Sequence, residues 1–171
     1  MLKLTKALTC EAADEIAIGV IEACNRNEFK PVTVSIVDAA SQIIVQKRMT
    51  GCPSGSFPKF SLAKAVAASS LMMPSRNFSQ KYATNDPAKL LQGIAMVGIT
   101  DGAVAPFPGG VVIRDKETME VIGAVGVSGA AGDEDEYCAL AGIHSSSFAK
   151  LIITEPTSHS CTTHKVSFYN I

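Results

Sequence analysis

The sequence lacks several features that mark large classes of protein. Its charges nearly cancel, with 15 Lys and Arg against 16 Asp and Glu, whereas binding to nucleic-acid phosphates needs a clustered excess of basic residues. No uninterrupted apolar run approaches the roughly 18 residues that a membrane-spanning helix needs. The opening sequence, MLKLTKALTC, holds no apolar run of signal-peptide length. These absences argue against nucleic acid and membrane as partners, and we expect a cytoplasmic protein.

The chain also lacks the cysteine patterns and the catalytic motif that would identify other classes of protein. The five cysteines are an odd number and no two of them have a CxxC spacing, so neither a disulfide framework nor a zinc ribbon is expected. No GxSxG nucleophile elbow occurs in the chain. An HxCxxH sequence at 159–164 offers soft ligands but has no obvious fourth ligand nearby. We therefore expect free thiols and no metal site.

What is present suits one folded domain. Hydrophobic residues make up 47% of the 171 positions and charged residues 18%, which favours a sizeable core over a disordered chain. Hydrophobic periodicity predicts helices at 9–28, 60–73, 75–82 and 133–150, and strands at 32–38, 43–49, 111–115 and 121–127. Another helix begins at Asp86-Pro87, and the segment 94–100 is either its end or a strand. Short connections between the strands imply an antiparallel sheet with helices packed on it, an α+β fold.

A run of glycines follows the last predicted strand. The glycines from Gly123 to Gly132 recur at every third position and precede the acidic sequence at 133–136. A glycine-rich turn before a helix is typical of phosphate binding, but carboxylates at the start of that helix would repel phosphate. We therefore expect these glycines to permit tight turns and close backbone packing.

Two basic residues in the largely apolar segment 60–80 are candidates for ligand binding. Lys64 and Arg76 could meet a ligand carboxylate, since a guanidinium group binds a carboxylate through two N–H groups. A structural interpretation is equally open, with a lysine stem that passes the core and an arginine that caps a helix end.

Several segments taken together resemble one known family. They are VSIVDAA (34–40), RM (48–49), SLAKAVAAS (61–69), PSR (74–76), PGGVVIRD (108–115), VIGAVGVSGA (121–130) and DEDEYCALAGI (133–143). Their order and spacing are similar to the GlcG/HbpS-like family, which includes the C-terminal domain of PduO-type proteins. The resemblance covers about residues 8–150. It implies a profilin-like antiparallel sheet flanked by helices. We expect a single domain at 1–154, followed by a largely polar C-terminal extension at 155–171.

The resemblance also implies a class of function. Some members of the family bind haem, and the family is sometimes described as haem-degrading. We therefore expect an oligomeric small-molecule-binding protein whose ligand is haem or another tetrapyrrole, in homo-oligomers that range from dimers to octamers. The expected pocket lies between the helical region 60–76 and the segment 107–113. Its expected ligand-binding residues are Lys64, Arg76, Gly109, Gly110, Phe107 and Phe60.

Two other functions stay open from the sequence. One is an enzyme that acts on a small carboxylated metabolite, with Asp38 or Asp135 as the base. The other is a structural or interaction module without a ligand, in which the glycines serve packing. Because a fold does not imply a function, the sequence leaves open whether the protein is an enzyme.

Overall fold

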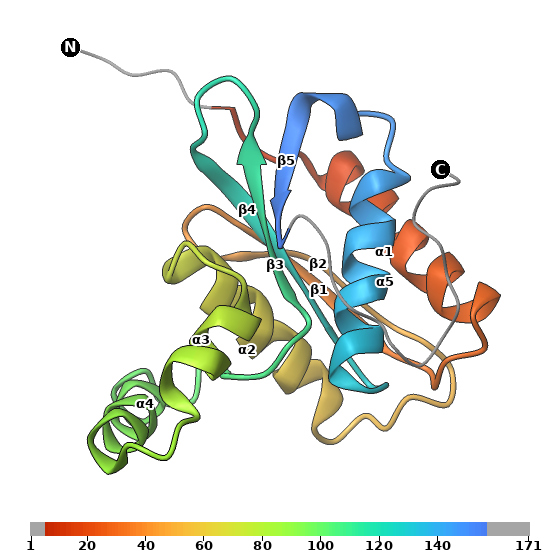
Figure 1. The fold of residues 1–171 in the computed structure, drawn as a ribbon. Helices are drawn as coiled ribbons and strands as arrows, with labels where there is room; N and C mark the ends of the chain where they lie inside the picture. Colours follow the sequence, from red (N-terminus) through yellow and green to blue (C-terminus); the bar gives the residue numbers. More distant parts are fainter. Residues whose placement is uncertain (1–5, 157–171) are drawn as a thin grey trace.

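In the computed structural model, which describes residues 6–156, a five-stranded sheet lies between two layers of helices (Figure 1). The strands are β1 (Thr33–Asp38), β2 (Ile43–Arg48), β3 (Gly110–Asp115), β4 (Val121–Ser128) and β5 (Ile152–Glu155). The helices are α1 (Cys10–Arg26), α2 (Phe57–Ser70), α3 (Ser75–Tyr82), α4 (Pro87–Ile99) and α5 (Gly132–His144), with a 3-10 turn η1 (Ala149–Leu151). All neighbouring strands are antiparallel, in the order β2-β1-β4-β3-β5. The predicted α+β class is confirmed.

Helices α1 and α5 cover one face of the sheet and enclose the main hydrophobic core. Helix α1 is capped by Thr9, whose side chain accepts a hydrogen bond from the Ala12 amide at 3.2 Å. Its apolar residues then recur at helical spacing, so that Ile16 and Val20 are fully buried against the sheet and α5. The apolar periodicity of the sequence therefore predicts the buried face of α1 correctly.

Helix α2 covers the opposite face, and glycines in the sheet let it approach very closely. A Cβ atom placed on Gly126 of β4 would lie 2.0 Å from the backbone oxygen of Ser61 in α2. The hydroxyl groups of Ser61 and Ser35 are also hydrogen-bonded across this contact, at 2.7 Å. The structure agrees with the expectation that these glycines serve close packing.

The last long helix is shorter than the sequence predicts, because it ends at His144 and not near Lys150. The hydroxyl groups of Ser145 and Ser146 donate to the carbonyl oxygens of Gly142 and Ile143 at 3.0 and 2.7 Å. Serine side chains that bond to nearby backbone in this way compete with helix continuation. The freed chain forms η1 and then β5, which pairs with β3. The sequence pattern did not predict this short strand.

The ambiguous segment 94–100 belongs to a helix, α4, that extends away from the sheet (Figure 1). Asp86 caps it by accepting from the Ala88 amide at 3.0 Å, and Pro87 occupies its first turn. The only buried residue of α4 is Gly93, and the helix packs mainly on α3. Within the described residues, no helix combines the length and the apolar character that crossing a membrane requires.

Candidate ligand-binding site

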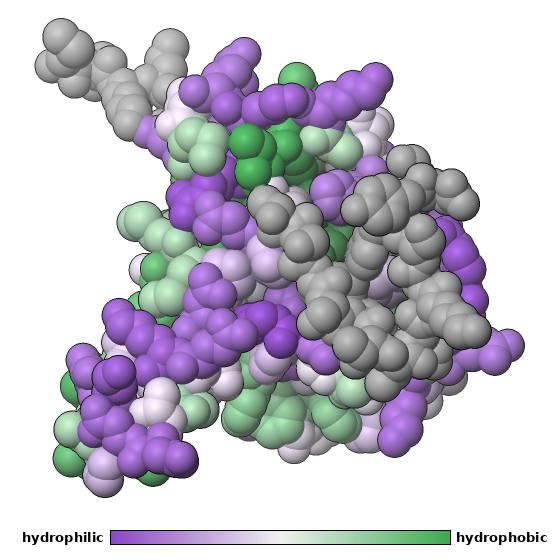
Figure 2. Space-filling model, in the orientation of Figure 1, coloured by the Kyte–Doolittle hydropathy of each residue, from purple (hydrophilic) through white to green (hydrophobic). Residues whose placement is uncertain are grey.

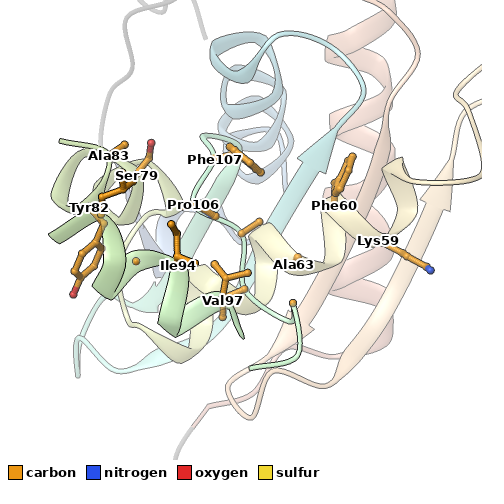
Figure 3. A pocket seen from close by; sticks show the side chains of 15 residues that line it. Lys59, Phe60, Ala63, Ser79, Tyr82, Ala83, Ile94, Val97, Pro106 and Phe107 are labelled. Atoms are coloured by element: carbon orange, nitrogen blue, oxygen red, sulfur yellow. The ribbon is translucent and has the colours of Figure 1, made fainter. Parts of the chain in front are cut away.

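A pocket of about 640 Å³ opens between α2, α3, α4 and the segment 102–107 that leads into β3 (Figure 3). This volume falls in the range of about 300–1,000 Å³ that is typical of small-molecule sites. Its lining is almost entirely apolar. The apolar lining residues are Phe60, Ala63, Ala83, Leu90, Ile94, Val97, Val104, Ala105, Pro106 and Phe107.

Helix α4 forms one wall because its apolar residues recur at helical spacing. Leu90, Gly93, Ile94 and Val97 are at positions i, i+3, i+4 and i+7, and all of them line the pocket. A Cβ atom on Gly93 would lie 2.8 Å from Cβ of Tyr82. Glycine at this position therefore lets α4 approach α3 closely enough to enclose the pocket.

The facing wall comes from α2 and from the segment that precedes β3. Phe60 and Phe107 both line the pocket while remaining 43% and 54% exposed, so they form part of its rim. Both residues were predicted from the sequence to lie in the pocket wall, and the structure places them there. Their contribution to ligand binding stays a prediction.

Polar groups are few along this surface. Lys59 carries the only charge among the lining residues, and Ser79 and Tyr82 carry the only side-chain hydroxyl groups. In Figure 3 the Lys59 side chain extends away from the cavity, and the hydroxyl of Tyr82 points away from Phe60 and Phe107. The pocket therefore suits an apolar ligand body, with one flexible cation near the rim that could reach an acidic group.

Lys64 does not line this pocket. Its side chain is buried, with Nζ 2.7 Å from Oδ2 of Asp135 and 2.8 Å from the carbonyl oxygen of Val127. Burial raises the pKa of Asp135, although the charge and hydrogen bond of Lys64 oppose that shift. This ion pair joins α2 to the start of α5 beside the end of β4.

Arg76 also pairs with carboxylates of α5. Its Nε donates to Oε2 of Glu136 at 2.6 Å, and its Nη2 contacts Asp133. Burial raises the pKa of Glu136, and the hydrogen bond from Arg76 opposes this effect. The other oxygen of Glu136, Oε1, is buried without a hydrogen-bond partner. Both predicted cations thus already have anionic partners within the chain.

Gly109 and Gly110 lie at the start of β3, directly after the segment 102–107 that lines the pocket. Gly109 has φ +117°, and a Cβ atom on Gly110 would lie 2.3 Å from the backbone oxygen of Lys64. The Gly110 amide donates to the Ser75 hydroxyl at 2.8 Å, and that hydroxyl donates to the Phe107 carbonyl. In this structure the two glycines bring the backbone close to α2 and α3, and neither lines the pocket.

The two aspartates considered as catalytic bases are engaged in the fold. Asp38 accepts hydrogen bonds from the amides of Ala40 and Gln42, both at 2.8 Å, and so holds the turn between β1 and β2. Asp135 pairs with Lys64. Neither carboxylate lines the pocket, so neither lies where it could act as a base on a ligand bound there.

The sequence analysis missed the α4 wall and Lys59. The i, i+3, i+4, i+7 pattern from Leu90 to Val97 would have indicated the wall, but the β-like segment 94–100 obscured it. Lys59 gives no sequence signal that distinguishes it from other exposed lysines. The described cysteines, Cys10, Cys24, Cys52 and Cys138, are free as expected. The HxCxxH sequence lies outside the described residues, among which no cluster of potential metal ligands occurs.

The chain thus combines an α+β domain built on an antiparallel sheet with an apolar pocket whose size is typical of small-molecule sites. Residues 8–144 match the family model described as haem degrading protein HbpS-like, and the chain belongs to that family. The resemblance seen in the sequence is therefore confirmed. No curated protein matches the chain.

Solved structures of several proteins share the fold. Klebsiella pneumoniae protein ORFY is 26% identical, with a TM-score of 0.70 over 83% of this chain and 93% of its own. A double mutant of Streptomyces reticuli HbpS is 27% identical, with a TM-score of 0.68 over 82% of this chain and 88% of its own. A PduOC complex with haem is 24% identical, with a TM-score of 0.70 over 80% and 93% of the two chains.

Haem fits this pocket only in part. The apolar lining suits the face of a porphyrin ring, and Lys59 could meet a propionate. Protein ligands of haem iron are usually His, Cys, Met or Tyr. None of the described lining residues is His, Cys or Met, and the hydroxyl of Tyr82 points away from the cavity. The pocket wall therefore suits the macrocycle and supplies no ligand to its iron.

Proposed function

We propose that this protein is a small-molecule-binding homo-oligomer whose ligand is a flat, largely apolar acid, with haem or another tetrapyrrole as the leading candidate. The observation that carries the proposal is the apolar pocket of about 640 Å³. The haem-degrading description of the family and the haem complex of PduOC support the choice of ligand. An open pocket also favours ligand binding over a purely structural role.

The ligand ring would lie against Phe60, Phe107 and the α4 wall, and most of its binding free energy would come from burial of apolar surface. Lys59 would meet an acidic group at the rim. Since the wall supplies no iron ligand, the metal-free ring should bind about as well as the ring that carries iron. Lys64 and Arg76 remain predicted ligand contacts, although their pairing with Asp135 and Glu136 favours a structural role.

The first experiment is a titration of the purified protein with haemin and with protoporphyrin IX, followed by absorbance. We expect a saturable Soret shift at a fixed stoichiometry for both compounds. The absence of a shift beyond that of an unrelated protein would remove the tetrapyrrole assignment. Much tighter binding of haemin than of protoporphyrin IX would show that iron ligation dominates and that this pocket is not the site.

Truncating the aromatic rim should weaken binding. Phe107→Ala removes about half of a buried phenyl contact, which corresponds to roughly a tenfold higher Kd. Ile18→Ala is the matched control, because Ile18 is 45% exposed on α1 and does not line the pocket. Equal affinities of Phe107→Ala and the parent protein would place the ligand elsewhere.

The same titration tests whether Lys59 or Arg76 binds the acidic group of the ligand. Lys59→Met should weaken the binding of an acidic ligand about threefold to tenfold, as expected for one partly exposed ion pair. Comparison with the methyl ester of the ligand is the control, because an uncharged ester should not distinguish Lys59→Met from the parent protein. If Arg76→Met weakens acid binding and Lys59→Met does not, the sequence-based assignment of Arg76 is the correct one.

A further inference from the structure

Two cysteines lie in adjacent helices that cover the same face of the sheet. Cys24 is in the last turn of α1 and Cys138 is in the middle of α5, and both are fully buried in the main hydrophobic core. Both are free thiols in this structure. Neither lines the pocket, so the proposed function leaves these two buried nucleophiles without a role.

Helices α1 and α5 run antiparallel, and two contacts fix the register between them. The Ser147 hydroxyl, just past the end of α5, donates to the Glu15 carboxylate of α1 at 3.0 Å. Five residues farther along α1, Cγ2 of Val20 would lie 2.5 Å from a Cβ atom on Gly142, which is five residues before Ser147. The two segments therefore pair at equal steps in opposite directions.

One further helical turn brings the two cysteines together. Cys24 is four residues after Val20 and Cys138 is four residues before Gly142, so both thiols lie on the line of contact between the helices. Hydrogen bonding with Cys138 lowers the pKa of Cys24, and the same hydrogen bond, together with burial, raises the pKa of Cys138. Of the two thiols, Cys24 is therefore the one that ionises first.

Glycines bring the backbones of the two helices into contact beside this pair. A Cβ atom on Gly142 would lie 2.7 Å from the carbonyl oxygen of Ile16, and one on Gly19 would lie 3.0 Å from Cα of Gly142. A disulfide requires two Cα atoms within about 7 Å of each other. Because the helices touch at the backbone one turn away, facing residues can meet this limit with little movement of either helix.

We infer that Cys24 and Cys138 form a modification site, at which hydrogen peroxide converts the two thiols into a disulfide that joins α1 to α5. The Cys24 sulfur attacks one peroxide oxygen, the O–O bond breaks, and Cys24 becomes a sulfenic acid as one water leaves. The Cys138 sulfur then attacks the Cys24 sulfur, and the S–O bond breaks with release of a second water. The two thiols lose two electrons and two protons, and the peroxide is reduced to two waters.

The end of α1 gives the oxidant its route to Cys24. The Cys24 thiol donates to the carbonyl oxygen of Lys30 at 3.3 Å, and Asn25, Arg26 and Lys30 are all exposed. Figure 2 shows hydrophilic surface at the right-hand edge, where Figure 1 places the last turn of α1. Helix ends open at a lower free energy than the core does, and hydrogen peroxide is small enough to enter through such an opening.

Mass spectrometry of the full chain without reductant tests the site, in a Cys10→Ser variant that removes an exposed thiol. After treatment with hydrogen peroxide, we expect a loss of about 2 Da, the mass of the two hydrogens lost, and its reversal by dithiothreitol. Proteolysis should yield a cross-linked peptide pair that contains Cys24 and Cys138. Further replacement of either residue by serine should abolish the link, whereas Cys52→Ser, at another buried cysteine, should keep it.

The same treatment in urea separates a site built by the fold from random pairing. The folded protein should link Cys24 to Cys138, whereas the unfolded chain should distribute its links over several pairs. A folded protein that gains oxygen without a link, or that links either residue to another cysteine, would overturn the inference.

Stability distinguishes a link that fits the native structure from one that distorts it. A fitting cross-link restricts mainly the unfolded chain, so the oxidised protein should unfold at a higher urea concentration than the reduced protein. An unchanged or lower midpoint would overturn the inference. Since neither cysteine lines the pocket, the ligand titration tests the proposed function independently of these outcomes.

Discussion

Replacing Lys64 by Met should lower the free energy of unfolding by about 3–5 kcal/mol, the usual cost of removing one partner of a buried ion pair. The side chains of Lys64 and Asp135 are 5% and 2% exposed, and their charged atoms are 2.7 Å apart. Without the lysine, a carboxylate stays buried with only the Ala130 amide as its remaining donor. Urea unfolding followed by circular dichroism measures the loss, and Lys59→Met, on the exposed side of the same helix, should change it by less than about 0.5 kcal/mol.

The pH dependence of this variant distinguishes a lost ion pair from lost packing. Burial raises the folded-state pKa of Asp135 above its ordinary value of 3.8, and removal of Lys64 should raise that pKa further. A carboxyl group with a raised folded-state pKa stabilises the fold at low pH and loses that contribution as the pH rises through the raised value. The difference between the parent protein and Lys64→Met should therefore shrink as the pH falls toward 4. A difference that is constant with pH would assign the effect to packing alone.

A double variant, Lys64→Met with Asp135→Leu, should recover part of this stability. It removes both charges from the interior, and buried ion pairs are often replaced by apolar residues at little cost. The recovery should be incomplete because the Ala130 amide and the Val127 carbonyl lose their partners. A double variant as unstable as the single one would contradict this account.

The sequence predicted those parts of the molecule in which one physical pattern dominates. Helix α1 has a capping threonine and a regular apolar face, and β1 and β4 are rich in β-branched residues, so these elements lie close to where they were expected. Hydrophobic periodicity did not predict the elements whose ends depend on local hydrogen bonds or on pairing with distant strands. The serines after His144 end α5 early, and the four residues of β5 are too few to show a period.

The candidate site also contains residues whose place the sequence predicted and residues whose role it left open. Phe60 and Phe107 were predicted as apolar wall residues of a pocket between the helical region 60–76 and the segment 107–113, and both line the pocket. Lys64 and Arg76 could not be assigned, because a cation in an apolar segment needs an anionic partner and the sequence does not say whether a ligand supplies it. In the structure Asp135 and Glu136, 71 and 60 positions away, are those partners.

Adding a single methyl group at Gly126 should be as damaging as any exchange in the core. A Cβ atom there would lie 2.0 Å from the oxygen of Ser61 and 2.5 Å from the nitrogen of Ala65, both backbone atoms of α2. No side-chain rotation relieves such a contact, so α2 must move away from β4. Overpacking of a core typically costs about 1–3 kcal/mol and occasionally more, and we expect Gly126→Ala to lose about 3 kcal/mol or more in urea unfolding.

The same substitution should also weaken ligand binding, because α2 carries Phe60 and Ala63 of the pocket wall. A displaced α2 would also strain the hydrogen bond between Ser61 and Ser35, so the loss of stability and the loss of affinity have one structural origin. Gly55→Ala is the control, since a Cβ atom there would meet nothing within 4 Å and stability should change by less than about 0.5 kcal/mol. If Gly126→Ala were as stable as the control, α2 could not lie as close to β4 as the structure shows. If it lost stability but kept full affinity, the ligand would bind away from the α2 wall.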